Sequence, residues 1–326
     1  MKPRMMEIGS FLELDFINTG EYYDQKSDIA RLNTGRAAIW HALRVLGGST
    51  VWLPYYQCDT VREFLKSKNV SIKYYHIDCE FNPIDLTPAG DEAVLFVNYF
   101  GVMSHDRMRD LVKGYKKVII DNSQAFFCAP VSGCMNVYSC RKFVGVPDGA
   151  YVIGKGAHSY VKDYEKGYSS DTALFLFQRI EYGCEGKAYV NRQSNERRID
   201  TEDIKQMSEL THRILGATDY EKIERKRIEN FNTIHSLIGS MNQIDAMKYY
   251  RQDCVPMVYP FVVENDGLLD KLQRHKHFQG HWWSYLLEEM KENDFEYWIS
   301  RYVIPITIDQ RYGNKEMNYI GEIICK

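Results

Sequence analysis

Several features that define specialised classes of protein are missing from the 326-residue sequence. No stretch reaches the roughly 18 consecutive apolar residues of a membrane-spanning helix, so we expect no membrane span. The formal net charge of -3, with no long basic run, argues against a nucleic-acid-binding surface. Internal repeats and low-complexity linkers are also lacking. An ordinary globular protein remains, and its length predicts roughly two domains of about 150 residues each.

The eight cysteines include no CxxC pair and no regular framework. In a chain of this length they predict reduced thiols in a cytoplasmic protein. The cluster His275, His277 and His281 has zinc-like spacing on one side only, without a second pair of ligands. Residues 1–16 lack the apolar core and the cleavage site of a secretion signal. We therefore expect a cytoplasmic protein without a metal site.

From about residue 30 the sequence alternates short apolar runs with amphipathic segments. Strands that are separated by helices of about ten residues predict crossover connections and a mainly parallel, doubly wound sheet. The α/β fold class follows from this alternation. The expected strands are 50–54, 71–77, 93–100, 116–121, 137–140 and 149–154, and the expected helices between them are 34–46, 57–68 and 104–113.

The sequence pattern changes after about residue 156. Charged, helical stretches dominate residues 172–240, and a second alternation of strands and helices follows. This predicts a large domain over residues 1–215 and a smaller C-terminal α+β domain over residues 216–326. The elements expected in the last part are strands 255–265 and 302–308 and helices 282–292 and 315–324.

One of the expected strands ends in a residue with a carboxylate side chain. The strand KKVIID ends in Asp121, which is followed directly by Asn122, Ser123 and Gln124. In open α/β sheets, functional side chains gather at the carboxyl ends of strands, where a carboxylate can partner a cationic ring nitrogen. The alternative is a turn or helix-cap aspartate, because Asp-Asn-Ser is also favourable turn chemistry.

A lysine follows the next strand. Lys142 comes after VYSC and before a turn rich in Gly and Pro, where we expect it to be held near the sheet edge and partly desolvated. Desolvation and a neighbouring positive charge lower the pKa of an amine and make it nucleophilic toward an aldehyde. Ser139, three residues earlier, could reach a phosphate oxygen. The alternative is an ordinary surface lysine on a loop.

A third feature is the start of the first expected helix, at Thr34, Gly35 and Arg36. Small residues leave backbone N–H groups accessible there, and the helix dipole favours an anion such as phosphate. The signal is weak by itself, since many helices begin with Thr-Gly and bind no ligand.

Together, the three features match the needs of pyridoxal 5′-phosphate (PLP): an anion site, an acid facing the ring nitrogen and a lysine for the aldehyde. In this order they resemble the fold type I PLP enzymes, and within them the DegT/DnrJ/StrS-type sugar aminotransferases. The resemblance runs from Leu32 to about Ile323, and its most specific parts are Asp-x-x-Gln at 121–124 and Ser-x-x-Lys at 139–142. Other matching stretches are LNTGRAAIWHAL, VWLPYYQCDT, FVNYFGV, QMSELTHRIL and VIPITIDQRYGNKEM.

The resemblance implies an aspartate-aminotransferase-like large domain of three α/β/α layers and a PLP-dependent aminotransferase. The enzyme would move an amino group from an amino acid, with glutamate the expected donor, to a keto-sugar, free or nucleotide-linked. A homodimer is implied as well. By the same resemblance, Lys142 forms the Schiff base, Asp121 keeps the ring nitrogen protonated and Gln124 faces the 3-hydroxyl. Ser139, Thr34, Gly35 and Arg36 would hold the phosphate, and Tyr56 would cover the ring.

The sequence also departs from the family pattern. Ala150 replaces the second Gly after the lysine turn, and Ile204-Lys205-Gln206-Met207 replaces Asn-x-Arg-Met, whose Asn reaches the partner's cofactor phosphate in the family. Arg36 could offset that loss with a direct charge on the phosphate. Lys142 argues against the related sugar dehydratases, which carry His at this position. The alternative function is a catalytically silent homologue with a scaffold or regulatory role.

Overall fold

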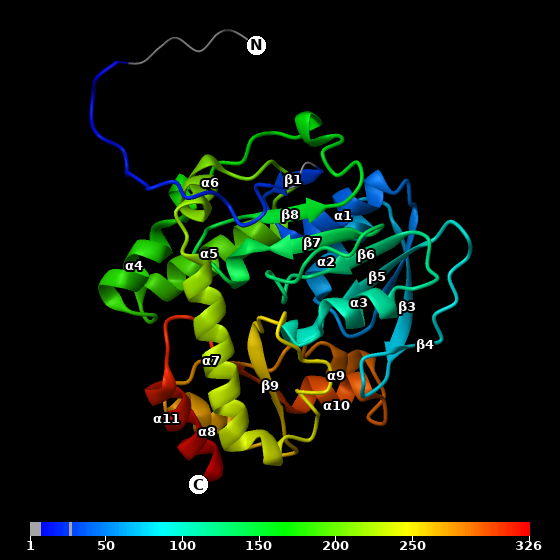
Figure 1. Cartoon of the computed structure of the whole chain (residues 1–326), viewed down its shortest axis with the longest axis vertical. Coiled ribbons are helices and arrows are strands. Elements are labelled where there is room, and N and C mark those ends of the chain that lie inside the picture. The colour runs from blue at the N-terminus through cyan, green and yellow to red at the C-terminus, as the bar shows by residue number, and fades with distance from the viewer. Residues whose placement is uncertain (1–7, 26–27) are drawn as a thin grey trace.

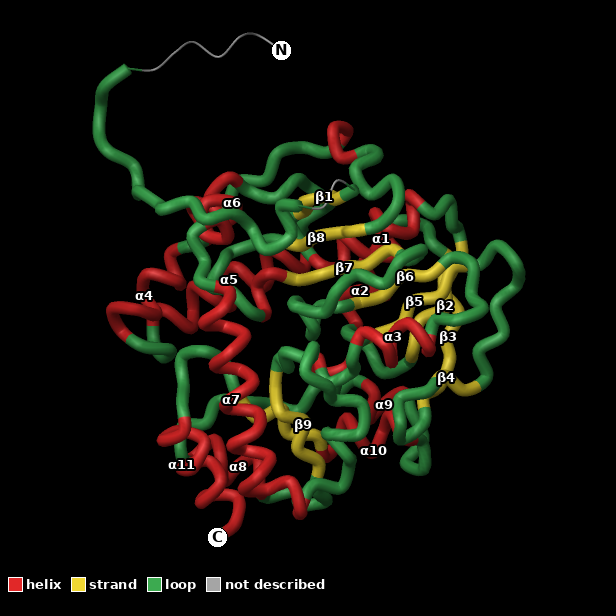
Figure 2. The backbone as a smooth tube through the Cα atoms, viewed as in Figure 1, coloured by secondary structure: helices red, strands yellow, loops and turns green. Residues whose placement is uncertain are grey.

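The computed structural model describes residues 8–25 and 28–326. Its centre is an eight-stranded sheet in the order β1-β8-β7-β6-β5-β2-β3-β4 (Figures 1 and 2). The five strands from β7 to β3 run parallel, while β1, β8 and β4 join in antiparallel pairings. The strands are β1 (Ile29–Leu32), β2 (Thr50–Pro54), β3 (Ser71–Ile77), β4 (Pro83–Ile84), β5 (Ala93–Val97), β6 (Val118–Asp121), β7 (Met135–Ser139) and β8 (Ala150–Ile153).

Helices flank this sheet, as the sequence predicts for an α/β fold. Helix α1 (Gly35–Val45) packs on β6, β7 and β8 and against α2 (Asp59–Ser67), while α3 (His105–Leu111) lies in front of the strands in Figure 1. At one end of the sheet lie α4 (Leu174–Tyr182), α5 (Lys187–Thr201) and α6 (Glu209–Gly216).

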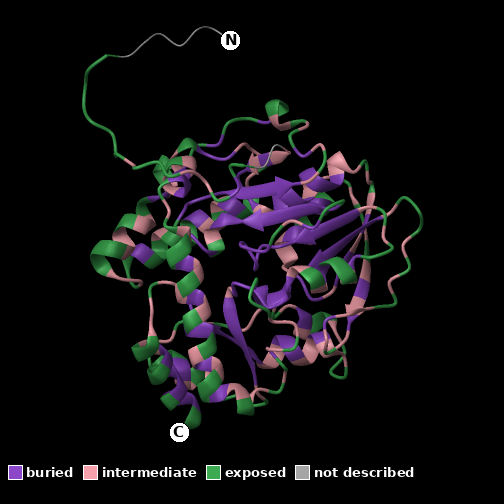
Figure 3. Cartoon of the chain, in the orientation of Figure 1, coloured by how far each residue is buried: buried purple, intermediate pink, exposed green. Residues whose placement is uncertain are grey.

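The C-terminal part contains a second sheet of two antiparallel strands, β9 (Val258–Val262) and β10 (Val303–Thr307). The long helix α7 (Tyr220–Ile238) contacts both β9 and α11 (Asn314–Cys325). One apolar core continues from β5 into β9 and β10, and Figure 3 shows β5 and β9 as buried. The remaining helices are α8 (Leu268–Arg274), α9 (Leu286–Glu289) and α10 (Phe295–Tyr302).

Most predicted strands are confirmed within one to three residues at each end, and β2 and β3 have the predicted bounds. The central strands β5, β6, β7 and β8 are buried along their whole length, which is why their sequences are continuous apolar runs. The expected helix over 282–292 is wrong: only the single turn α9 is helical. Trp283 has a φ of +57°, which interrupts a helix, and its ring packs edge-on against Tyr56.

Candidate cofactor site at the carboxyl end of the sheet

Asp121 is the last residue of β6 and lies beside the last residue of the neighbouring parallel strand β5. In the sheet register it pairs with Val97 of β5 on one side and with Val137 of β7 on the other. Its side chain is buried, and Oδ1 accepts a hydrogen bond of 2.9 Å from the backbone N–H of Ser123. Within the described chain, Oδ2 has no hydrogen-bond donor. The turn expected as the alternative is therefore present, and it still leaves one carboxylate oxygen to face a ligand.

The start of α1 forms a candidate anion site beside this turn. Thr34 is the N-cap, and its side chain accepts from the backbone N–H of Ala37 at 3.3 Å. The N–H groups of Gly35 and Arg36, at the first two helical positions, donate to no acceptor among the residues that the structure describes. They point out of the helix at the positive end of its dipole, where an anion is stabilised.

Two serines lie against the same helix start. A Cβ atom added to Gly35 would lie 3.4 Å from Ser123 Oγ and 3.9 Å from Ser139 Cβ. Glycine thus lets the α1 backbone approach both serine side chains, beside the N–H groups of Gly35 and Arg36. Ser139 was predicted from the sequence, whereas Ser123 was missed. Its position in Asp-Asn-Ser was interpreted only as turn chemistry, although it follows the carboxylate by two residues.

The guanidinium of Arg36 does not take part in this anion site. It is buried beneath α5, where it pairs with Asp200 at 3.3 Å and donates to the carbonyl oxygens of Ile199 and Glu202. Burial lowers the pKa of Arg36, and its plane lies over the ring of Phe64. The structure does not support the expectation that this side chain offsets the missing phosphate contact, because both terminal nitrogens of the guanidinium bond to the end of α5.

Gln124 has its amide group oriented by the backbone. Its Oε1 accepts a hydrogen bond of 2.6 Å from the N–H of Phe100, which has a left-handed φ of +59°. Gly101 follows with a φ of +74°, and a Cβ there would lie 2.4 Å from the backbone oxygen of Gln124. Because the oxygen of the side-chain amide is occupied, its NH₂ group remains available to donate to a ligand oxygen. The strained Phe100-Gly101 turn thus fixes which end of Gln124 is free.

Lys142 ends a short 3₁₀ turn, Cys140–Lys142, directly after β7. Its side chain is exposed, so the expected partial desolvation is not found within one chain. The backbone of the turn is held firmly, since Arg227 donates to the carbonyl oxygen of Lys142 and Gln310 to that of Phe143 at 2.8 Å. Arg227 is buried, which lowers its pKa to about 10, and it lies over the ring of Phe143.

Tyr56 belongs to the core and not to the site. Its ring has no exposed surface and packs between Tyr99 and Trp283. Burial raises the pKa of its phenol well above the usual value, and the hydroxyl has no hydrogen-bond partner within the described residues. A ring without an exposed face cannot cover a cofactor, so the structure does not support the role predicted for Tyr56.

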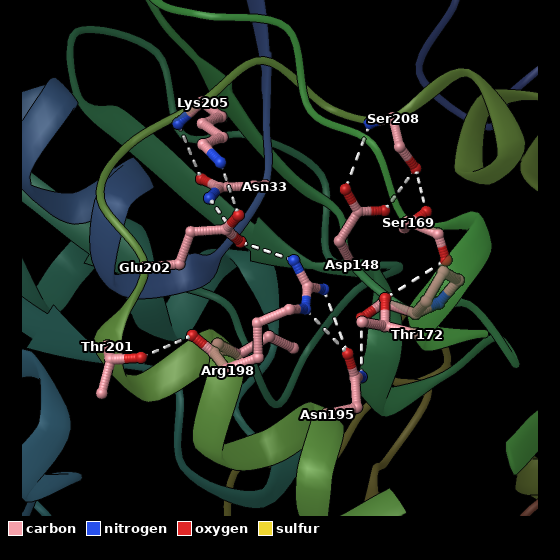
Figure 4. Close-up of polar contacts among 12 residues, drawn as sticks. Asn33, Asp148, Ser169, Thr172, Asn195, Arg198, Thr201, Glu202, Lys205 and Ser208 are labelled. Carbon is pink, nitrogen blue, oxygen red and sulfur yellow. Dashed lines mark hydrogen bonds and ion pairs between the residues drawn. The ribbon is translucent and has the colours of Figure 1, made fainter. Parts of the chain in front are cut away.

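The segment that replaces the family's Asn-x-Arg-Met has structural contacts of its own, of which Figure 4 shows those of Lys205. Gln206 Nε2 donates to the backbone oxygens of Val161 and Tyr164, and Lys205 pairs with Glu202. The neighbouring carboxylate of Asp148 is buried and accepts from the N–H and hydroxyl of Ser208, which starts α6. Burial raises the pKa of Asp148. These residues fasten α6 to the lysine turn.

Other chemistries have less support. In the described part of the chain, no group of three His, Cys, Asp or Glu side chains is arranged to hold a metal ion. The buried thiols of Cys128 and Cys134 have pKa values raised by burial to about 12 and about 11, which makes them poor nucleophiles. Over residues 8–25 and 28–326, the structure contains no helix with the length and apolar character needed to cross a bilayer.

Solved structures share this fold over nearly the whole chain. A DegT/DnrJ/EryC1/StrS aminotransferase from Brucella abortus is 12% identical, with 93% of this chain and 86% of that one covered and a TM-score of 0.61. The sugar aminotransferase CalS13 from Micromonospora echinospora is 14% identical, with 92% and 87% covered and a TM-score of 0.61. DesV from S. venezuelae, solved with a ketimine intermediate, is 17% identical, with 92% and 84% covered and a TM-score of 0.58.

No protein-family model and no curated protein sequence matches the chain. The solved structures confirm, at the level of the fold, the family resemblance inferred from the sequence motifs: the chain has the architecture of the DegT/DnrJ/EryC1/StrS aminotransferases.

Proposed function

We propose that the chain is a PLP-dependent aminotransferase that transfers an amino group from an amino acid to a keto-sugar. One observation carries the proposal: the start of α1 at Gly35 lies against Ser123 and Ser139, and Ser123 donates its N–H to the carboxylate of Asp121. The lysine turn begins directly after Ser139. An anion site, a carboxylate and a primary amine at one sheet edge would meet the requirements of PLP, and the solved structures of the same fold include Spr1654 from Streptococcus pneumoniae in its PLP form.

The residues present fit this cofactor, which when bound supplies an electron sink for breaking bonds next to an amine. The N–H groups of Gly35 and Arg36 and the hydroxyls of Ser123 and Ser139 would hold its phosphate. Asp121 would hold a proton on the ring nitrogen, because a carboxylate in this buried position stabilises a neighbouring cation.

Gln124 and Lys142 complete the set of residues. The free NH₂ group of Gln124 would donate to the ring oxygen. Lys142 would bind the aldehyde through its amine and then move a proton to and from the substrate carbon. The exposed side chain of Lys142 leaves its amine accessible to the cofactor.

We propose a keto-sugar acceptor, free or nucleotide-linked, and glutamate as the donor. The support comes from relatives in fold: CalS13 is a sugar aminotransferase, and DesI was solved in the presence of its TDP-sugar product. DesI is 13% identical, with 92% of this chain and 80% of that one covered and a TM-score of 0.61.

The same proposal includes a cytoplasmic homodimer with a large domain over 1–215 and a small domain over 216–326. The eight cysteines are free, which fits a reducing compartment. The small domain contributes Arg227 and Gln310 to the lysine turn, so its position would be coupled to that of Lys142.

A catalytically silent homologue is the second candidate. Arg36 is turned away from the anion site, and Ile204 and Gln206 stand where the family carries Asn and Arg. Both observations weaken the hold on a phosphate. A protein of this kind would keep the fold for a scaffold or regulatory role.

The visible absorption spectrum after addition of PLP separates the two candidates. We expect a violet-to-blue band that is lost on borohydride reduction, and peptide mapping that then finds the reduced adduct on Lys142. Lys142→Ala should lose the band and the half-reaction with glutamate, the latter by about 1000-fold or more. Lys155→Ala, which changes an exposed lysine after β8, is the matched control. A wild-type protein without a band at saturating PLP would favour the silent homologue.

A further inference from the structure

Helix α4 is apolar and yet has no buried residue. Its sequence, LFLFQRIEY, contains six large hydrophobic side chains in nine positions. A helix that is apolar on most of its surface is normally buried, because exposed apolar area is unfavourable in water. Phe177 is 46% exposed and Ile180 is 82% exposed. Within one chain only part of this surface is covered, chiefly by the neighbouring helix α5.

Exposed apolar side chains continue from α4 onto α5 and recur on the N-terminal arm, residues 8–17. Of the nineteen exposed large hydrophobic residues in the described chain, eleven lie in these two places. This concentration marks an interaction surface, because single exposed apolar residues are otherwise scattered. The eleven are Ile8, Phe11, Leu12, Leu14 and Ile17 on the arm, and Leu174, Phe177, Ile180, Tyr182, Tyr189 and Val190 on α4 and α5.

The arm projects from the body on the side of these helices. It is anchored at Thr19, whose N–H donates to the carbonyl oxygen of Gly216 at the end of α6 at 2.7 Å. Figure 1 shows the arm leaving the body beside α6 and running outward, with α4 on the same left-hand side. Phe11 is 91% exposed and Leu12 is 96% exposed. The apolar residues of the arm and those of α4 and α5 are therefore exposed in the same chain, and neither set covers the other.

The two surfaces carry opposite charges. The arm contains Glu13 and Asp15 and no basic residue. The exposed face of α5 contains Lys187, Arg192 and Arg197, of which Lys187 and Arg197 share a face with Val190 because they are three and seven positions away. Glu13 also pairs with Arg213 of its own chain at 3.5 Å, but both side chains are exposed and such a pair is weak.

We propose that a second copy of this chain covers the α4–α5 face with its N-terminal arm, and that the exchange is mutual. A twofold interface requires that each copy offer both members of a complementary pair, and this chain offers an acidic apolar arm and a basic apolar helix pair. The apolar side chains would supply the binding energy, and Asp15 with Arg197 would set the register.

The same face adjoins the lysine turn. Asn195 on α5 donates to the carbonyl oxygen of Pro147, and Glu196 pairs with Arg141. A Cβ on Gly145 would lie 3.8 Å from the side chain of Leu176 on α4. A second copy seated here would therefore border the turn that carries the exposed Lys142. This inference deepens the proposed dimer by naming its surface.

The first test is the dissociation constant of the full-length protein without PLP, measured by light scattering over a dilution series. Wild type should have twice the mass of one chain at micromolar concentration. Phe11→Ser/Leu12→Ser and, separately, Phe177→Ser/Ile180→Ser should each raise the dissociation constant by about 30-fold or more. Tyr319→Ser, at a 52% exposed aromatic residue on α11, is the matched control and should change nothing. Unchanged circular dichroism in each variant excludes unfolding.

Charge exchange tests the register. Asp15→Lys and Arg197→Glu should each weaken the dimer, and the double variant should recover most of the loss because the charges are again opposite. A monomeric wild type would overturn the proposal, and so would a dimer that both Ser pairs leave intact. Dissociation by the α4 pair alone would overturn the role of the arm. The PLP spectrum is recorded separately, so a dimer without a PLP band would contradict the proposed activity and leave this interface standing.

Discussion

Two regions of the molecule differ in how far one chain buries and pairs their side chains: the sheet edge with the candidate site, and the α4–α5 face. At the edge, Asp121, Ser123 and Gln124 are buried; Ser123 donates to Asp121 within the turn, and Gln124 accepts from the N–H of Phe100. On the α4–α5 face, a largely apolar helix has no buried residue at all. The contrast teaches that the fold arranges its polar candidate site within one chain, whereas it leaves the apolar α4–α5 face exposed, as the proposed dimer requires. Lys142 lies where these two regions meet.

The largest effect on activity is expected at the sheet edge that holds the candidate site. Asp121→Asn should lower the rate of the half-reaction with glutamate by about 100-fold or more, because a neutral amide does not hold a proton on the ring nitrogen. PLP should still bind, and its absorption band should persist. Asp91→Asn, at an exposed aspartate, serves as the control. Stopped-flow measurement of the half-reaction checks this, and an Asp121→Asn enzyme as fast as wild type would remove Asp121 from the site.

The anion site gives the next largest effect. Gly35→Val should raise the Kd for PLP by about 30-fold, because the added methyl groups would enter the space that Ser123 and Ser139 share with the α1 backbone. Gly35→Ala should have a much smaller effect, since its Cβ would be at ordinary contact distance, 3.4 Å from Ser123 Oγ. Fluorescence titration with PLP measures both variants. Equal affinities in the two would show that the phosphate binds elsewhere.

A smaller effect is expected where the arm joins the body. Burial of the Glu21 carboxylate raises its pKa, but hydrogen bonds from His212, Arg31 and Tyr151 outweigh this and lower the pKa to about 2, from 4.5. The charged form therefore stabilises the fold above pH 4.5, and this contribution is lost as the pH falls from about 4.5 toward 2.

Glu21→Gln should accordingly lower the free energy of unfolding by about 2 kcal/mol at pH 7, with solvent screening included. Urea unfolding at pH 7 and at several values below 4.5 checks this, because the two proteins should converge as Glu21 becomes protonated. A difference that stays constant with pH would mean that the variant loses packing and not a charged interaction. Glu209→Gln, at an exposed glutamate on α6, is the control.

The sequence by itself determined the sheet and the positions of the chemical groups along it. Apolar runs such as AVLFV and VIID predict central strands, and the positions of Asp121, Gln124 and Ser139 follow from where the strands end. The start of α1 was predictable in the same way, since Thr34 and Gly35 are a local cap signal. These features depend on residues within a few positions of one another.

Only the tertiary structure decided where the long side chains go and which surfaces stay open. Arg36 turns to the end of α5, more than 160 positions away, and Tyr56 is enclosed by Trp283. Ser123 joins the anion site because Gly35 lets two backbones approach, and Trp283 breaks a helix that the local pattern favours. Each depends on partners distant in sequence, and local propensities do not encode which distant residues meet. The apolar sequence of α4 likewise predicts a buried helix, and only the fold shows that none of its residues is buried.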